Sequence, residues 1–84
     1  MPFTASKAMF KATVITSRQT LFEGQVKIAF LPGVSGEFEI LEFHKPLVSL
    51  LKEGIILFDE IKSVAISKGI VRFRDNELVA LVEQ

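Results

Sequence analysis

Hydrophobic and polar residues alternate along the first part of the chain. The alternation runs through residues 10–15, stops at the polar stretch Ser17–Thr20, and resumes through residues 21–31. A period of two is typical of a β-strand, because successive side chains of a strand point to opposite faces. Gly24 interrupts the second run and predicts a bulge or a close backbone approach there. The pair Pro32-Gly33 should end that run.

Shorter apolar runs follow, and turn-forming residues separate them. The expected strands are Phe38–Leu41, Leu47–Leu51, Ile55–Phe58, Ile61–Ser67, Ile70–Arg74 and Leu78–Val82. The expected connections between them are Glu53-Gly54, Asp59-Glu60, Lys68-Gly69 and Asp75-Asn76. Turn signals therefore recur about every ten residues, a spacing that favours an all-β domain.

Several of the expected strands have apolar residues on both faces, as in Val79-Ala80-Leu81-Val82. Strands of this kind are expected at the centre of two packed sheets. Long helices are not expected, since Gly or Pro interrupts every helical stripe. We therefore predict one domain over residues 1–84, an all-β fold in the form of a small antiparallel β-sandwich or flattened barrel of about eight to ten short strands.

Composition narrows the class of partner. The chain is 49% hydrophobic with eight Phe, which suits one compact core, and ten basic residues balance ten acidic ones. The basic residues are scattered, so we expect neither nucleic acid nor an anionic membrane surface as a partner. The absence of Cys rules out disulfides and thiolate metal sites and fits an intracellular compartment. The sequence has no apolar run of about 20 residues and no secretory leader, so we expect a soluble, unprocessed protein.

Candidate chemistry is sparse. His44 is the one histidine, and a metal site there would need carboxylates converging from distant turns. There are two other interpretations: a loop histidine beside Pro46 that is hydrogen-bonded to backbone, or a residue that contacts a protein partner. Gly33–Gly36 could suggest a phosphate loop, but no Lys-Ser or Lys-Thr pair follows it, so a turn between strands is expected. No cofactor is predicted.

The remaining polar residues favour structural roles. Catalysis by a pair of carboxylates needs one of them desolvated, whereas Glu37, Glu39 and Glu42 are expected on an exposed strand and turn. No base neighbours the serines along the sequence. Arg72 and Arg74 flank Phe73, an arrangement that single-stranded nucleic acid binders use, but the outer face of a hairpin is the expected place for them. We expect no enzymatic activity.

Five segments in order resemble the epsilon subunit of F-type ATP synthase. They are LFEGQV at 21–26, LPGVSGEFEIL at 31–41, HKPLVSLLKEG at 44–54, AISKGIV at 65–71, and the last strand at 76–82. The resemblance spans about residues 10–82 and is specific in its order and spacing. It implies the N-terminal β-sandwich domain of that family.

The chain also departs from the family pattern. Glu39 replaces a usual Gly, Glu42-Phe43 replaces Pro-Gly before the histidine, Lys68 replaces the first of two Gly, Glu53 replaces a frequent Pro, and Asp59-Glu60 replaces a longer hairpin. We expect a reshaped turn before His44 and altered local geometry where Gly is lost. Relatives continue into two inhibitory helices, and since this chain stops at Gln84 we expect it to lack them.

The resemblance implies a non-catalytic rotor subunit of the central stalk, serving ATP synthesis and hydrogen ion transport. The expected partners are the gamma subunit, the polar loops of the c-ring and the catalytic head. The expected location is peripheral, on the cytoplasmic face of the bacterial inner membrane, with membrane association only through the complex. By position, Glu37 and His44 match family residues near the c-ring loops and the base of gamma, and we expect both on exposed turns at one end of the sandwich. Thr16 and Ser49 match the gamma-facing side.

Two other classes of function stay open at this point. A free-standing β-sandwich could capture an extended peptide along an exposed sheet edge. A nucleotide-processing enzyme is the third interpretation. A gene beside that of the ATP synthase beta subunit would favour the rotor.

Overall fold

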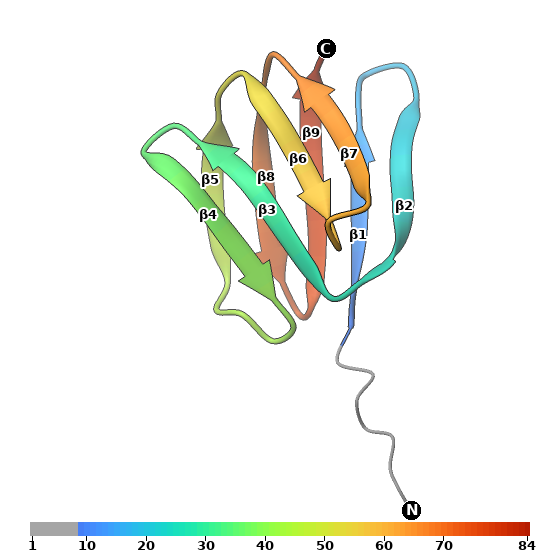
Figure 1. Ribbon diagram of the computed structural model, residues 1–84, viewed down its shortest axis with the longest axis vertical. Coiled ribbons are helices and arrows are strands. Elements are labelled where there is room, and N and C mark those ends of the chain that lie inside the picture. Colours follow the sequence, from blue (N-terminus) through green and yellow to red (C-terminus); the bar gives the residue numbers. More distant parts are fainter. Residues whose placement is uncertain (1–8) are drawn as a thin grey trace, which may run out of the picture.

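The computed structural model describes residues 9–84, and the fold there is built from β-strands (Figure 1). No helix long and apolar enough to cross a membrane occurs in that part of the chain. The strands are β1 Phe10–Ile15, β2 Thr20–Val26, β3 Ile28–Gly33, β4 Gly36–Leu41, β5 Leu47–Leu51, β6 Gly54–Phe58, β7 Lys62–Ile66, β8 Lys68–Arg74 and β9 Glu77–Glu83. The predicted all-β sandwich is confirmed.

The strands form two layers. One layer, in the order β2-β1-β9-β8-β5, is called here the β8 layer; the other, in the order β4-β3-β6-β7, is called the β3 layer. In Figure 1 the β3 layer lies in front of the fainter strands of the β8 layer. The layers are joined at one corner, where Gly33 pairs with Leu51 and the Val34 N–H donates to the Leu50 carbonyl at 3.0 Å.

One strand pair is not antiparallel, contrary to the sequence-based expectation. β1 runs parallel to β9, with Lys11 opposite Glu77 and Ile15 opposite Leu81, while the other pairs are antiparallel. A local turn cannot specify this pairing, because a parallel pair needs a long connection. Here almost the whole chain lies between the two strands, so the first and last strands of the chain lie side by side within the β8 layer.

The expected strand over residues 21–31 is two strands that belong to different layers. The chain turns at Lys27, and the Asp59 carboxylate fixes this corner by accepting from the N–H groups of Lys27 and Ile28 at 2.8 and 3.0 Å. Gly24 marks neither the predicted bulge nor a close backbone approach. It pairs regularly with Ala12, the irregularity lies between Val14 and Ile15, and the nearest atoms to a Cβ at Gly24 would be those of the Phe22 ring, from 3.4 Å. The corner was missed because its acceptor comes from a residue 32 positions away.

Three of the expected connections are displaced, and in one of them, Glu53-Gly54, the glycine already belongs to β6. Pro32-Gly33 belongs to the end of β3 and pairs with β4, so the turn itself consists of Val34 and Ser35. Only Ser67 separates β7 from β8, so the predicted Lys68-Gly69 turn is wrong: both residues pair with β9. A Cβ at Gly69 would lie 2.8 Å from the Leu81 carbonyl oxygen, and Gly is therefore required for close strand approach.

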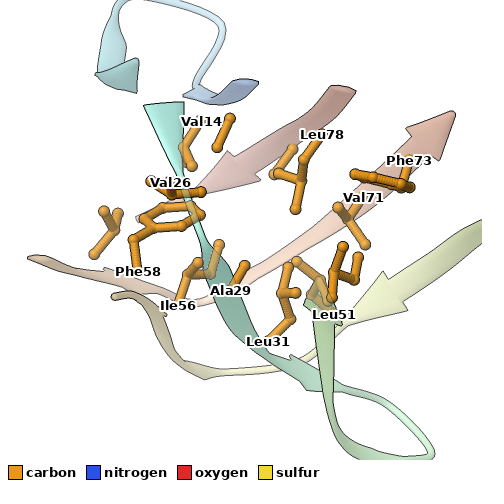
Figure 2. Packing of buried hydrophobic residues seen from close by; sticks show 14 of the residues in the cluster. Val14, Val26, Ala29, Leu31, Leu51, Ile56, Phe58, Val71, Phe73 and Leu78 are labelled. Atoms are coloured by element: carbon orange, nitrogen blue, oxygen red, sulfur yellow. The ribbon is translucent and has the colours of Figure 1, made fainter. Parts of the chain in front are cut away.

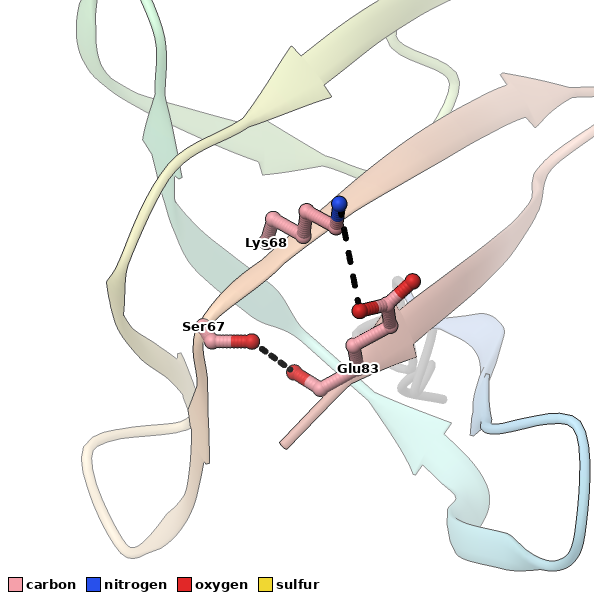
Figure 3. A network of polar contacts seen from close by, with 3 residues as sticks. All are labelled: Ser67, Lys68 and Glu83. Carbon is pink, nitrogen blue, oxygen red and sulfur yellow. Dashed lines mark hydrogen bonds and ion pairs between the residues drawn. The ribbon is translucent and has the colours of Figure 1, made fainter.

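The β7–β8 corner is tied to the end of β9 (Figure 3). The Ser67 N–H and hydroxyl both donate to the Glu83 carbonyl oxygen, at 2.7 and 3.1 Å. The Lys68 ammonium and the Glu83 carboxylate form an exposed ion pair at 3.9 Å. The backbone bond sets this corner, because a surface ion pair contributes only about 0–1 kcal/mol.

The core lies between the layers and consists of side chains from one face of nearly every strand (Figure 2). Its largest fully buried side chains are Phe10, Phe58, Phe73, Leu31, Ile40, Ile56, Leu78, Val14 and Val71. Phe10 and Phe73 meet edge to face with centroids 5.4 Å apart, and Phe22 stacks on Phe58 at 4.5 Å. Interdigitation of this kind makes the domain stiff.

Candidate protein-interaction surfaces

The outer face of the β8 layer carries exposed apolar residues. Cross-strand pairing places Leu50 beside Ile70, Ile70 beside Leu81, and Leu81 beside Ile15, across β5, β8, β9 and β1. We call these four residues the outer apolar row. Leu50, Ile70 and Leu81 are exposed and Ile15 is half-buried. Such a continuous apolar strip is typical of a surface that binds a protein partner.

A second row of the same face is mixed. Val48 pairs with Arg72, and Arg72 pairs with Val79, which pairs with Thr13. Val48 is 66% exposed and its neighbour Leu50 is 60% exposed. The two rows together line a shallow depression of about 270 Å³ formed by Val48, Ile70, Val71, Arg72, Val79 and Leu81.

The β3 layer has a different outer face. Phe30, Ile55 and Leu57 form the floor of a depression of about 640 Å³, and Glu37, Glu60 and Ser63 complete its lining. The strand residues that point outward from this layer in the described chain include Glu37 and Glu39 but no lysine or arginine. The two faces of the sandwich therefore differ in charge as well as in shape.

Glu37 and His44 do not lie at one end, contrary to the sequence-based expectation. Glu37 is the second residue of β4, whereas His44 follows the last residue of that strand. A strand rises about 3.3 Å per residue, so the four steps from Glu37 to the end of β4 alone cover roughly 13 Å. The expectation failed because both residues were assigned to turns, and Glu37 belongs to a strand.

His44 has a local structural environment. Its Nδ1 lies 2.8 Å from the Lys45 carbonyl oxygen, and its ring is nearly perpendicular to that of buried Phe73, with the ring centroids 6.1 Å apart. The side chain is half-buried. His44 therefore has the backbone contact expected of a loop histidine, and its contact to a protein partner stays a prediction. Within residues 9–84 no group of three or more acidic or histidine side chains is placed to hold a metal ion.

Thr16 borders the β8 layer's outer face, whereas Ser49 faces the core. Thr16 follows β1 and begins the turn to β2. In this turn its hydroxyl oxygen accepts from the N–H groups of Arg18 and Gln19 at 3.1 Å each. It also lines a depression of about 540 Å³ that includes Ile70 and Leu81 of the outer apolar row. Ser49 is half-buried on the core-facing side of β5, between the outward-facing Val48 and Leu50.

The structure adds residues that sequence reasoning did not single out. They are the exposed members of the outer apolar row, Val48, and Phe43, which is 79% exposed. The apolar residues of the last strand had been assigned to a core between two sheets, yet Leu78, Ala80 and Val82 face the core while Leu81 faces outward. The sequence did show apolar residues on both faces of this strand. One face packs in the core, and the other forms an exposed apolar surface.

Comparison with known proteins identifies the domain. The model of the ATP synthase delta/epsilon chain β-sandwich domain matches residues 9–84. The ATP synthase epsilon chain of a Nitratiruptor species is 38% identical over 77 residues, covering 87% of this chain and 60% of that relative. The corresponding chain of Campylobacter fetus is 35% identical over 74 residues, covering 83% and 57%. This chain thus spans about three fifths of the length of these relatives.

Solved structures share the fold. A chain in the mitochondrial ATP synthase of Euglena gracilis, described as OSCP, F1 and c-ring, aligns with a TM-score of 0.80 at 19% identity, covering 99% of this chain and 57% of that one. A chain in the central stalk and c-ring structure of Tetrahymena thermophila mitochondrial ATP synthase aligns with a TM-score of 0.73 at 12% identity, covering 88% and 63%. The sequence match and the shared fold agree, and the chain belongs to the ATP synthase delta/epsilon family through its β-sandwich domain.

Proposed function

We propose that this protein is a non-catalytic rotor subunit of a proton-translocating F-type ATP synthase. In this role it couples rotation of the c-ring to the gamma subunit and the catalytic head. The observation that carries the proposal is the outer apolar row on a domain of the epsilon family. A rotor element transmits torque through stiffness and matched surfaces, and the interdigitated core supplies the stiffness. The complex holds the protein peripherally at the cytoplasmic face of the bacterial inner membrane.

The gamma subunit is the proposed partner of the β8 layer. Leu50, Ile70 and Leu81 would be removed from water on binding, and apolar burial contributes about 25 cal/mol per Å². Thr16 lies at the border of this surface, where polar groups help fix the relative position of the subunits. Ser49, the other residue expected on the gamma side, lies on the core-facing side of β5. A surface of typical size, about 800 Å² on each partner, would cover the row and its neighbours.

Association with gamma is the first expected result. Co-expression of the chain with gamma should give a pair that stays together on a sizing column at about micromolar concentration. The binding should also raise the melting temperature, because a ligand that binds only the folded state stabilises it. Two folded proteins that elute separately would count against the rotor assignment and favour a sandwich that binds a peptide at a sheet edge.

Glu37 and His44 are proposed to support coupling from two different places. Glu37 lies on the acidic outer face of the β3 layer and would meet basic or amide groups of the c-ring polar loops. His44 lies at the far end of β4 and would meet the base of gamma. Both contacts would set the relative position of the subunits more than they would raise the binding affinity, because polar contacts at a solvent-exposed rim are individually weak.

Substitution of these two residues should therefore uncouple the enzyme without unfolding the domain. Glu37→Ala should leave the melting temperature within a few degrees, since an exposed substitution costs under about 0.5 kcal/mol. His44→Ala should cost somewhat more because the ring covers Phe73. Proton-driven ATP synthesis in reconstituted vesicles should fall for each single variant and further for the double variant. Normal synthesis by the folded double variant would remove both residues from the proposal.

A further inference from the structure

Phe43 combines exposure with an unfavourable backbone conformation. Its φ is 57°, in the left-handed region that glycine, asparagine and aspartate tolerate best. The other described non-glycine residues in this region are Asp59, Glu60, Asp75 and Asn76, all in tight hairpin connections. Phe43 is the large apolar side chain among the five, and 79% of it is exposed. The chain therefore holds an aromatic residue in a strained conformation that core burial does not offset.

Tertiary hydrogen bonds hold Phe43 in place. Its N–H donates to Asn76 Oδ1 at 2.6 Å, and the Asn76 side-chain amide donates to the Met9 carbonyl oxygen at 3.0 Å. The next residue, His44, donates its N–H to the Leu41 carbonyl at 3.1 Å. Asn76 belongs to the β8–β9 turn, so Phe43 is tied to the lower end of the β8 layer in Figure 1. The ring is thus presented from a fixed backbone.

Phe43 lies at one end of the β8 layer, through its bond to Asn76 in the β8–β9 turn. Pro46 and Val48, both exposed, follow it along the chain toward Leu50. Pro46 and Val48 also share a shallow depression of about 310 Å³ with Arg72 and Phe73. Phe43 is therefore fixed at the end of the layer whose outer face carries the exposed apolar residues Val48 and Leu50.

We propose that Phe43 is an anchor residue that inserts into an apolar pocket of the gamma subunit beyond the end of the β8 layer. The inference rests on the proposed function, because it takes the partner of the outer apolar row to be gamma. A pre-positioned aromatic side chain buries a large area and loses little conformational entropy on binding, which makes it a typical centre of binding energy. Burial against gamma offsets the backbone strain that the isolated domain retains.

Phe43→Asn tests the proposal through two effects of opposite sign. Asparagine tolerates the left-handed conformation, so the variant should melt at the same temperature as the wild type or a few degrees higher. Its affinity for purified gamma, measured by titration calorimetry with the full chain, should fall by about tenfold or more. Phe43→Tyr keeps the ring and should retain most of the affinity. A lower melting temperature for Phe43→Asn would show a structural residue and overturn the proposal.

Ile61→Asn is the matched control. Ile61 is 85% exposed in the β6–β7 connection of the other layer, and its φ is not positive. Its substitution should leave the affinity for gamma within about twofold. Equal weakening by Ile61→Asn and Phe43→Asn would overturn the proposal. Wild-type affinity of Phe43→Asn would overturn it and leave the proposed function intact, whereas a wild-type chain that fails to bind gamma would remove both.

Discussion

Leu50→Asp should abolish association with gamma and leave the isolated domain folded. Leu50 begins the outer apolar row on edge strand β5 and is 60% exposed, so its substitution removes no core contact. In the complex, the aspartate would have to lose its water inside an apolar contact, which is costly without a partner charge. The affinity should fall by about a hundredfold or more, equivalent to about 3 kcal/mol. Titration of purified gamma into the variant measures this loss.

Ile55→Asp supplies the matched control for this experiment. Ile55 is 56% exposed on the outer face of the β3 layer, so the two variants place the same charge at similar exposure on opposite faces. Ile55→Asp should bind gamma with nearly wild-type affinity, and both variants should melt within a few degrees of the wild type. The reverse pattern, with Ile55→Asp defective and Leu50→Asp normal, would assign gamma to the β3 layer.

The charge difference between the faces is consistent with this assignment. On the β8 layer, Lys11 and Glu23 form an ion pair at 3.3 Å, and Lys68 and Glu83 form another at 3.9 Å. These pairs lie at the strand ends and at the β1–β2 edge, away from the centre of the outer apolar row. On the β3 layer the charges of the outward strand residues are acidic. A partner of that face would therefore need basic or amide groups.

Most strands could be predicted because local patterning determines them. Phe10, Ala12 and Val14 alternate with polar or half-buried residues, and this alternation matches the buried side of β1. Asp75-Asn76 forms its predicted turn because both residues tolerate positive φ, at 52° and 58°. In the connection at Asp59-Glu60, Asp59 follows the same rule, with a φ of 52°. These features depend on a few neighbouring residues, so the sequence alone suffices for them.

Long-range pairing decides the features that could not be predicted. The corner at Lys27 depends on Asp59, and the parallel pairing of β1 depends on β9, so neither leaves a local signal. The outer apolar row exists only once β1, β9, β8 and β5 are side by side. The conformation of Phe43 likewise depends on Asn76, a residue 33 positions away. Glu37, His44, Thr16 and Ser49 came from the family resemblance, and their contacts remain predictions.

Phe73→Ala should unfold the isolated protein at a much lower urea concentration than the wild type. Phe73 is fully buried between the edge of Phe10 and the ring of His44. Truncation of a buried Phe to Ala costs about 3–5 kcal/mol, because apolar contacts are lost and a cavity remains. A domain of 84 residues has a total stability of about 4–13 kcal/mol. Phe73→Leu keeps most of the volume and should cost roughly 1–2 kcal/mol. Because the chain has no Trp or Tyr, far-UV circular dichroism during urea titration is the suitable measurement.

The response of Phe73→Ala to gamma separates a core defect from a surface defect. Since gamma should bind only the folded state, excess gamma should restore the folded signal of this variant, and its apparent affinity should fall in proportion to the unfolded fraction. Leu50→Asp should behave in the opposite way, with a normal folded signal and no recovery of binding at high gamma concentration. If Phe73→Ala has the urea midpoint of the wild type, the burial of this ring in the core is wrong. If its folded signal does not recover with gamma while the wild type binds, the linkage between this core and the gamma surface is wrong.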